Sequence, residues 1–286
     1  MKIIKSPHQL QQLLEKERIS GKSIGFIPTL GALHAGHLSL VKASNWENDV
    51  TVVSIFVNPA QFGPKEDYKK YPRVFAADKK MLQKFDVDYL FCPSAQSMYP
   101  PGFTTWVEVG AQQGPLLARG LCGRFRPGHF RGVATVVAKL LNIVGPSQLY
   151  LGAKDYQQVV IINQMVRDLN MNVRVRIMPT MRERDGLALS SRNRYLNAQE
   201  RKRAAMIFQV LRALKAIASK KKVPLASLRQ QAIQKLKRSV GTVQYLEIVD
   251  PLTLQPLQKY QRKMVVLTAC FVGKTRLIDN VIIHAQ

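Results

Sequence analysis

The sequence predicts an α/β fold with a mostly parallel sheet, followed by a second, smaller α+β domain toward the C-terminus. Three observations lead to this prediction. Apolar, β-branched runs alternate with helical patterns over the first 180 residues, which is typical of a parallel sheet covered on both faces. Two helical patterns then follow without a strand between them, and three strand-like segments come last. A length of 286 residues with 46% hydrophobic content is sufficient for two domains.

The first domain is expected to span residues 1–180. Ser6 and Pro7 open its first helix, because serine caps a helix and proline suits the first helical position. Continuous apolar runs between the helices indicate buried strands. The expected helices cover residues 7–18, 38–46, 72–85, 132–144 and 157–169, and the expected strands cover residues 23–27, 50–57, 88–91, 104–109, 148–151 and 173–178.

The second domain is expected to span residues 181–286, a size within the usual domain range. Its first part is polar and precedes two amphipathic helical patterns. Three alternating segments then indicate a small sheet. The expected helices cover residues 198–218 and 224–240, and the expected strands cover residues 244–249, 264–271 and 277–283.

Composition narrows the class of protein. No run of about 18 apolar residues is present, so no membrane span is predicted. The first residues lack the apolar core and cleavage site of a signal peptide. Cys92, Cys122 and Cys270 are far apart and odd in number, so neither a disulfide framework nor a zinc site is indicated. These features together predict a cytoplasmic protein.

The net charge of +25 indicates what kind of ligand or partner the protein attracts, and it carries no information about the fold. It favours anionic ligands, and nucleic acid is the competing explanation. Residues 201–240 hold 12 Lys and Arg and no acidic residue, including the run Lys220-Lys221-Lys222. Because the pattern there is amphipathic and aromatic residues are sparse, we interpret it as a solvated helical surface, and specific nucleic-acid binding is not expected.

The most informative motif is P-T-L-G-A-L-H-A-G-H at residues 28–37, which lies between the first expected strand and the next helix. His34 and His37 are three residues apart and therefore share one side of the first helical turn. A helix N-terminus attracts phosphate through its unpaired N–H groups. Two histidines also suit a metal pair, but no H-E-x-x-H motif and no neighbouring acidic residue supports that alternative.

Other phosphate-binding motifs are missing. Gly273-Lys274-Thr275 resembles the end of a P-loop, but that motif needs glycine where the chain has Thr268. No G-x-G-x-x-G follows a strand, so a dinucleotide fingerprint is also missing. A nucleotide site in this chain therefore depends on the H-A-G-H loop.

Three further segments carry groups suited to an anionic ligand. In G-A-K-D-Y-Q-Q at residues 152–158, Lys154 suits phosphate, and Asp155 suits either ribose hydroxyls or a helix cap. Residues 182–193 place two serines before Arg192, which suits phosphate or an ordinary helix entry. Residues 124–132 form a basic loop that suits an anion or solvent. Ligands of open α/β sheets bind beyond the carboxyl ends of strands, so we expect these loops to converge there.

Six ordered motifs resemble one family. The chain is similar to the pantoate–β-alanine ligases in P-T-L-G-A-L-H-A-G-H, F-V-N-P-A-Q-F, E-D-Y-K-K-Y-P-R, R-P-G-H-F-R-G-V-A-T-V-V, G-A-K-D-Y-Q-Q and D-G-L-A-L-S-S-R-N. Residues 245–250 and 275–280 match more loosely. The family usually has methionine where this chain has Leu30, and leucine preserves an apolar contact.

The resemblance implies a Rossmann-like nucleotidyltransferase domain, a C-terminal lid, a homodimer, and ATP and Mg²⁺ as requirements. Pantoate would attack the α-phosphate of ATP, and β-alanine would then attack the pantoyl adenylate. The metal ligands are unknown, with Asp78 as one candidate. A different H-x-G-H nucleotidyltransferase is the alternative enzyme, and it leaves F-V-N-P-A-Q-F unexplained.

The resemblance also assigns roles to residues. It implies catalytic roles for His34, His37 and Lys154, with His37 as the proton donor. The residues implied in ATP binding are Leu30, Gly31, Ala32, Leu33, His34, Ala35, Gly36, His37, Gly152, Ala153, Lys154, Asp155, Met181, Leu189, Ser190, Ser191 and Arg192. The residues implied in binding pantoate or β-alanine are Gln61, Gln158, Asn58, Arg126 and His129.

Overall fold

The computed structural model describes residues 1–64, 66–110, 117–220 and 223–285, which form two compact units. The first unit contains Met1–Val109, Arg126–Ala153 and Ile161–Pro179. The second contains Gly110–Phe125, Lys154–Val160 and Thr180–Gln286. Two segments from the first 180 residues therefore group with the C-terminal part of the chain. Lys221 and Lys222 of the predicted basic run lie outside the described residues.

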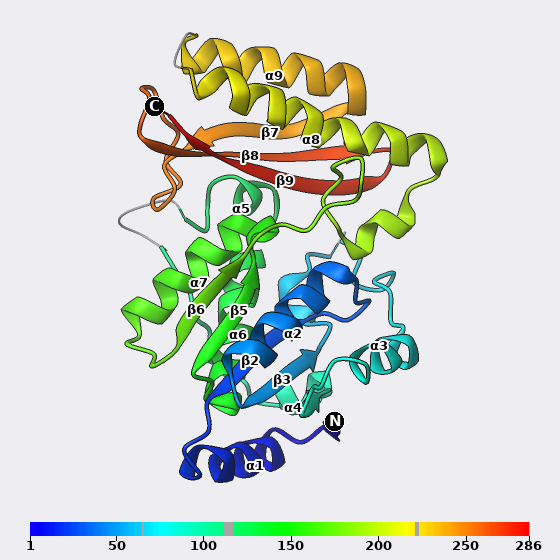
Figure 1. Cartoon of the computed structure of the whole chain (residues 1–286), viewed down its shortest axis with the longest axis vertical. Helices are drawn as coiled ribbons and strands as arrows, with labels where there is room; N and C mark the ends of the chain where they lie inside the picture. Colours follow the sequence, from blue (N-terminus) through cyan, green and yellow to red (C-terminus); the bar gives the residue numbers. More distant parts are fainter. Residues whose placement is uncertain (65, 111–116, 221–222, 286) are drawn as a thin grey trace. The chain divides into compact units, whose positions relative to one another are not determined.

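The first unit is built on a six-stranded, entirely parallel sheet with the order β1-β4-β3-β2-β5-β6 (Figure 1). The α/β class predicted from the sequence is confirmed. The chain leaves β2 toward β3 and returns to the other side of β2 at β5, which makes a topological switch point between β2 and β5. The strands are β1 (Lys2–Ile4), β2 (Ile24–Thr29), β3 (Val50–Ile55), β4 (Tyr89–Phe91), β5 (Gln148–Gly152) and β6 (Arg174–Met178).

The helices that accompany this sheet follow the predicted order. Ser6 caps the first helix by accepting a hydrogen bond from the Gln9 N–H at 3.3 Å. The helices are α1 (Pro7–Ile19), α2 (Ala35–Glu47), α3 (Phe75–Leu82), α4 (Ala95–Met98), α6 (His129–Val144) and α7 (Tyr156–Asp168), with single 3₁₀ turns η1 (Pro59–Gln61) and η2 (Ala153–Asp155).

Two details of the sheet differ from the prediction. Residues 104–109 form no strand, because the Val107 N–H donates to the Thr135 hydroxyl of α6 at 2.9 Å instead of to a sheet. The alternation there reflects packing on that helix, where the Arg131 guanidinium lies 5.0 Å from the Trp106 ring centre. Strand β1 was not predicted, since it has only three residues and depends on pairing with β4.

One face of the sheet is closed tightly by α2. A Cβ atom added to Gly25 would lie 2.1 Å from the Ser44 hydroxyl of α2, so only glycine allows this approach. Ile27 and Val53 are fully buried in one cluster with Leu40 and Val41 of the helix. This packing fixes the start of α2 against the carboxyl end of β2.

The second unit contains a three-stranded antiparallel sheet in the order β7-β8-β9, with α8 and α9 side by side on it (Figure 1). Asn197 and Glu200 form a reciprocal capping box at the start of α8. The elements are α5 (Cys122–Phe125), η3 (Ser191–Tyr195), α8 (Ala198–Ala218), α9 (Leu225–Val240), β7 (Thr242–Val249), β8 (Lys263–Val272) and β9 (Thr275–His284). Throughout the described ranges, every helix is too short or too polar to cross a bilayer.

Candidate active site

The two histidines of the H-A-G-H loop cap the start of α2. His34 is the N-cap residue, and its Nδ1 accepts a hydrogen bond from the Gly36 N–H at 3.2 Å. The Nδ1 of His37 accepts from the His34 N–H at 3.3 Å. The two rings lie 4.0 Å apart between centres. The loop therefore holds both imidazoles side by side at a helix N-terminus.

These hydrogen bonds define the tautomer of each neutral imidazole. A nitrogen that accepts an N–H hydrogen bond carries no proton, so Nδ1 is unprotonated in both His34 and His37. The proton of each neutral ring is then on Nε2. Both rings lie beside the positive end of the helix dipole, which favours the binding of phosphate oxygens.

The loop before His34 is held by two buried side chains. Thr29 Oγ1 accepts from the Gly31 N–H at 3.0 Å and donates to the Ser54 carbonyl at 2.7 Å. Each oxygen of Asp78 accepts one backbone N–H, from Ala32 and from Leu33, both at 2.8 Å. Asp78 is only 2% exposed. Its carboxylate therefore supports the loop.

Gly31 is required in this loop. Its φ of +80° belongs to the left-handed region, and an added Cβ would lie 3.1 Å from an oxygen of Asp78. Ala32 also has a positive φ, of 50°, which the paired N–H groups of the loop stabilise. The sequence showed the glycine, but it did not show that Asp78 accepts the N–H groups of the next two residues, Ala32 and Leu33.

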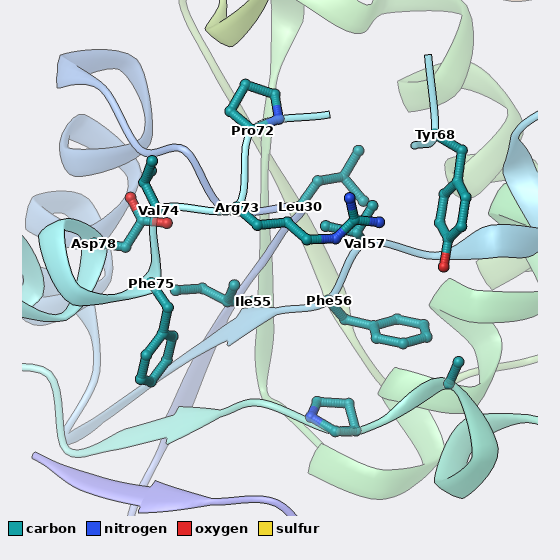
Figure 2. Close-up of a pocket in the computed structure, with 13 residues that line it drawn as sticks. Leu30, Ile55, Phe56, Val57, Tyr68, Pro72, Arg73, Val74, Phe75 and Asp78 are labelled. Atoms are coloured by element: carbon teal, nitrogen blue, oxygen red, sulfur yellow. The ribbon is translucent and has the colours of Figure 1, made fainter. Parts of the chain in front are cut away.

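A cavity of about 260 Å³ lies beside this loop in the first unit (Figure 2). Leu30 lines the cavity next to Arg73, whose guanidinium lies 5.1 Å from the ring centre of Tyr68. Figure 2 shows the Arg73 side chain extending past Leu30 toward Val57. The cavity lining is thus mostly apolar, and its charged residues are Arg73 and Asp78. Leu30, at the position where the resemblance leads us to expect methionine, forms part of the cavity wall.

Asn58 and Gln61 follow β3 at the same edge of the sheet. Asn58 is completely buried, and its amide nitrogen donates to Gln61 Oε1 and to the Gly132 carbonyl, both at 3.1 Å. Its carbonyl oxygen accepts from the Tyr99 hydroxyl at 2.8 Å and from the Ala60 N–H at 3.2 Å. Asn58 therefore uses its hydrogen-bonding groups to orient Gln61.

Arg126 and His129 surround the Gln61 main chain. His129 Nδ1 donates to the Gln61 carbonyl at 2.8 Å, and its Nε2 accepts from Arg126 at 2.9 Å. Arg126 also forms an ion pair with Glu66, in which Nε donates to the carboxylate at 2.8 Å. A Cβ on Gly132 would lie 2.1 Å from the Ala60 carbonyl, so α6 packs directly against η1. The basic loop of the sequence thus supports Gln61.

Lys154 and Asp155 come directly after β5 and belong to the second unit. The Lys154 ammonium lies 3.7 Å from an oxygen of Asp155, and the two side chains are 21% and 48% exposed. The preceding residues belong to the first unit: Gly152 ends β5, and Ala153 is the first residue of η2. Gln158 is half-buried in the first turns of α7.

The second unit also presents the serine-rich segment. Arg182 and Ala188 form an isolated antiparallel bridge, and the Leu189 N–H donates to the Met181 carbonyl at 3.0 Å. Residues 181–189 therefore form a short hairpin. Ser190 then caps η3 by accepting from the Arg192 N–H at 3.3 Å, and Ser191 is buried.

Gln157 is a residue that the sequence did not single out. Its side chain is buried and accepts from the Cys122 N–H at 2.9 Å. Its amide nitrogen donates to the carbonyls of Leu117 and Gly120, at 2.7 and 2.9 Å. Gln157 thereby ties the segment before α5 to the first turn of α7, next to Gln158. No motif signals this role, because the three partners are all backbone groups.

The described side chains that could bind a metal ion are scattered over the structure. Within the part of the chain that the structure describes, no three His, Cys, Asp or Glu side chains are grouped so as to hold a metal ion. Magnesium usually keeps several waters and binds through one or two carboxylates together with substrate phosphates.

A parallel sheet with a switch point and a histidine-capped helix N-terminus defines an α/β protein with a site suited to the phosphates of a nucleotide. The comparisons with known proteins agree with this class and narrow it. The family model for pantoate-beta-alanine ligase matches residues 2–282. This chain belongs to the pantoate–β-alanine ligase family.

Similar proteins cover the whole chain. The pantothenate synthetase of Thermodesulfovibrio yellowstonii is 48% identical over 285 residues, which cover 99% of this chain and 100% of that protein. The pantothenate synthetase of Thermotoga petrophila is 49% identical over 284 residues, which cover 99% and 100%.

Two solved structures are also similar. Pantothenate synthetase from Thermus thermophilus has a TM-score of 0.91 and 43% identity, over 98% of this chain and 99% of that one. Pantoate-beta-alanine ligase from Francisella tularensis, complexed with beta-gamma ATP and beta-alanine, has a TM-score of 0.82 and 39% identity. The match covers 98% of this chain and 97% of that chain.

Proposed function

We propose that this chain condenses (R)-pantoate with β-alanine to form pantothenate, using ATP and releasing AMP and pyrophosphate. Family membership over residues 2–282 supports the overall reaction. The observation in the structure that carries it is the pair of histidines that caps the N-terminus of α2. This is an arrangement for binding phosphate oxygens.

In the first step, a carboxylate oxygen of pantoate attacks the α-phosphorus of ATP, and the bond to the leaving pyrophosphate breaks. A carboxylate with a pKa of about 4 is ionised at neutral pH, so no nucleophile from the enzyme is required. Catalysis then depends on positioning two anions and stabilising the charge that develops on phosphate oxygens. We assign this task to His34, His37 and Lys154, with Ser190, Ser191 and Arg192.

In the second step, the amine of β-alanine attacks the acyl carbon, and AMP leaves with the oxygen that came from pantoate. We assign pantoate binding to Gln61 and Gln158, with Gln61 also near β-alanine. Asn58, Arg126 and His129 support Gln61, because each hydrogen bonds to its side chain or main chain. They act as positioning residues in this proposal.

The ATP-binding segments are Leu30–His37, Gly152–Asp155, Met181 and Leu189–Arg192. Magnesium, when bound, neutralises charge on the triphosphate, and the described residues leave most of its ligands to the nucleotide and water. We further propose that residues 181–286 close as a lid that keeps water from the acyl adenylate. The protein is proposed to act as a homodimer in the cytoplasm, with no specific nucleic-acid partner.

The experiment is a steady-state assay of pyrophosphate release from ATP and Mg²⁺, with pantoate and β-alanine supplied separately and together. The proposal predicts little release without pantoate, and continuous turnover only with both acids. The other H-x-G-H enzyme, which joins a nucleotide to a second nucleotide, would release pyrophosphate without regard to pantoate. That result would contradict the ligase assignment.

A further inference from the structure

Strand β9 carries a buried acidic residue, Asp279, that binds the hairpin at residues 181–189, which precedes Ser190. Arg182 donates through both terminal nitrogens to the two oxygens of Asp279, at 2.8 and 2.9 Å. Asp279 is 3% exposed and Arg182 is 18% exposed at the side chain, so the pair is largely screened from water. Such bidentate pairs hold a geometry more strictly than a single contact.

The same guanidinium organises the hairpin itself. Arg182 Nη1 also donates to the Gly186 carbonyl at 3.0 Å, across the turn, and Nη2 donates to the Asn280 carbonyl at 3.2 Å. Its guanidinium carbon lies 3.9 Å from the centre of the Phe208 ring, which packs against Gly186. The hairpin that leads into Leu189 is therefore fixed to β9 by one side chain.

The next residue of β9 holds the lysine segment. The side-chain amide of Asn280 donates to the Lys154 carbonyl at 3.0 Å. The backbone N–H of Asn280 donates to Asp279 Oδ1 at 2.7 Å, which couples the two neighbours directly. Asn280 is 5% exposed, so this anchor is buried. Lys154 is thereby held through its main chain, and this anchor does not use its ammonium group.

We propose that Asp279 and Asn280 are positioning residues. Through their contacts from β9, they fix two ATP-binding segments, at Lys154 and at Ser190–Arg192, in position relative to each other. This inference rests on the proposed function, which assigns those segments to ATP. Asp279 and Asn280 contact none of the substrates in this proposal. Its effect comes from placement, because a displacement of about 1 Å in a reacting group is enough to cost about 10²-fold in rate.

The first test replaces the two anchors separately. Asn280→Ala removes the donor to the Lys154 carbonyl, and Arg182→Lys cannot reproduce the fork that joins Gly186 to Asp279. The matched control is Arg229→Lys, since Arg229 pairs with Glu247 and the Leu246 carbonyl in the same unit, away from both segments. We expect the Kd for ATP, measured by calorimetry, to rise at least fivefold in both test variants and less than twofold in the control.

The second test asks whether Asn280 acts through Lys154. Asn280→Ala should reduce pantoate-dependent pyrophosphate release at least tenfold in the natural sequence, but less than twofold when Lys154 is already alanine. The KM for β-alanine should change less than twofold. Equal effects in both backgrounds, or an unchanged Kd for ATP in folded Asn280→Ala and Arg182→Lys, would overturn the inference.

These two measurements separate the inference from the proposed function. If the unmodified protein releases no pyrophosphate with pantoate, the ligase assignment fails. ATP affinity would still report whether β9 positions the nucleotide segments. Thermal melting of each variant keeps the comparison to folded protein.

Discussion

Asp78→Asn is the most informative substitution in the first unit, because it changes one charge without changing shape. Both carboxylate oxygens accept buried N–H groups of the H-A-G-H loop, from Ala32 and Leu33, at 2.8 Å. Asparagine retains one acceptor oxygen, and its NH₂ group faces the second N–H. One buried donor then loses its partner, and the other pairs with a neutral oxygen in place of a carboxylate.

The expected cost follows from these contacts. A hydrogen bond to a charged group contributes about 1.5–3 kcal/mol, and a buried N–H left without a partner costs about 1–3 kcal/mol. Since the two effects overlap at one site, we expect Asp78→Asn to lower the free energy of unfolding by about 2–4 kcal/mol. The displaced loop should also reduce kcat/KM for ATP by about 10-fold to 100-fold, the scale of a small misplacement of catalytic groups.

Urea unfolding followed by circular dichroism measures the first effect, and pyrophosphate release measures the second under conditions where the variant is folded. Asp86→Asn is the matched control, because Asp86 is exposed and follows the same helix. An unfolding free energy of Asp78→Asn within 0.5 kcal/mol of the unmodified protein, on the order of a neutral surface change, would refute the role given to this carboxylate.

Three further predictions concern the site. Tyr99→Phe removes the hydroxyl that donates to Asn58, and because burial raises the pKa of Tyr99, this hydroxyl is protonated between pH 7 and 9. We therefore expect a severalfold higher KM for pantoate, measured from initial rates in that pH range. An unchanged KM would contradict this prediction. Lys154→Ala and His37→Ala should each lower kcat by about 10² in the same assay, and near-normal turnover would remove that residue from the site. Leu30→Met should alter kcat/KM less than threefold because the two side chains have similar volumes, and a loss of tenfold or more would show that the cavity wall is specific.

Much of the fold could be predicted because its signals are local. The apolar runs that become β2, β3 and β5, and the cap at Ser6, depend on neighbouring residues in the chain. The paired histidines were also recognisable, since a helix start and a spacing of three place both rings together. The prediction of a strand at residues 104–109 was wrong, because alternation of apolar and polar residues alone does not distinguish sheet pairing from packing on α6.

The supports of the site could not be predicted because they join residues far apart in sequence. Asp78 lies 45 residues after the N–H group of Leu33, and Arg182 lies 97 residues before Asp279. Each partner is an ordinary charged residue in its local context. The sequence therefore predicted candidates for the residues that carry the chemistry, and the structure was required to find the residues that support them.

The central claim is that pantoate is activated as an acyl adenylate, and isotope transfer tests it most directly. A single turnover with pantoate labelled by ¹⁸O in its carboxylate, with ATP, Mg²⁺ and β-alanine, should place one labelled oxygen in AMP and none in pyrophosphate. Label found in pyrophosphate, or AMP formed without label, would contradict the account.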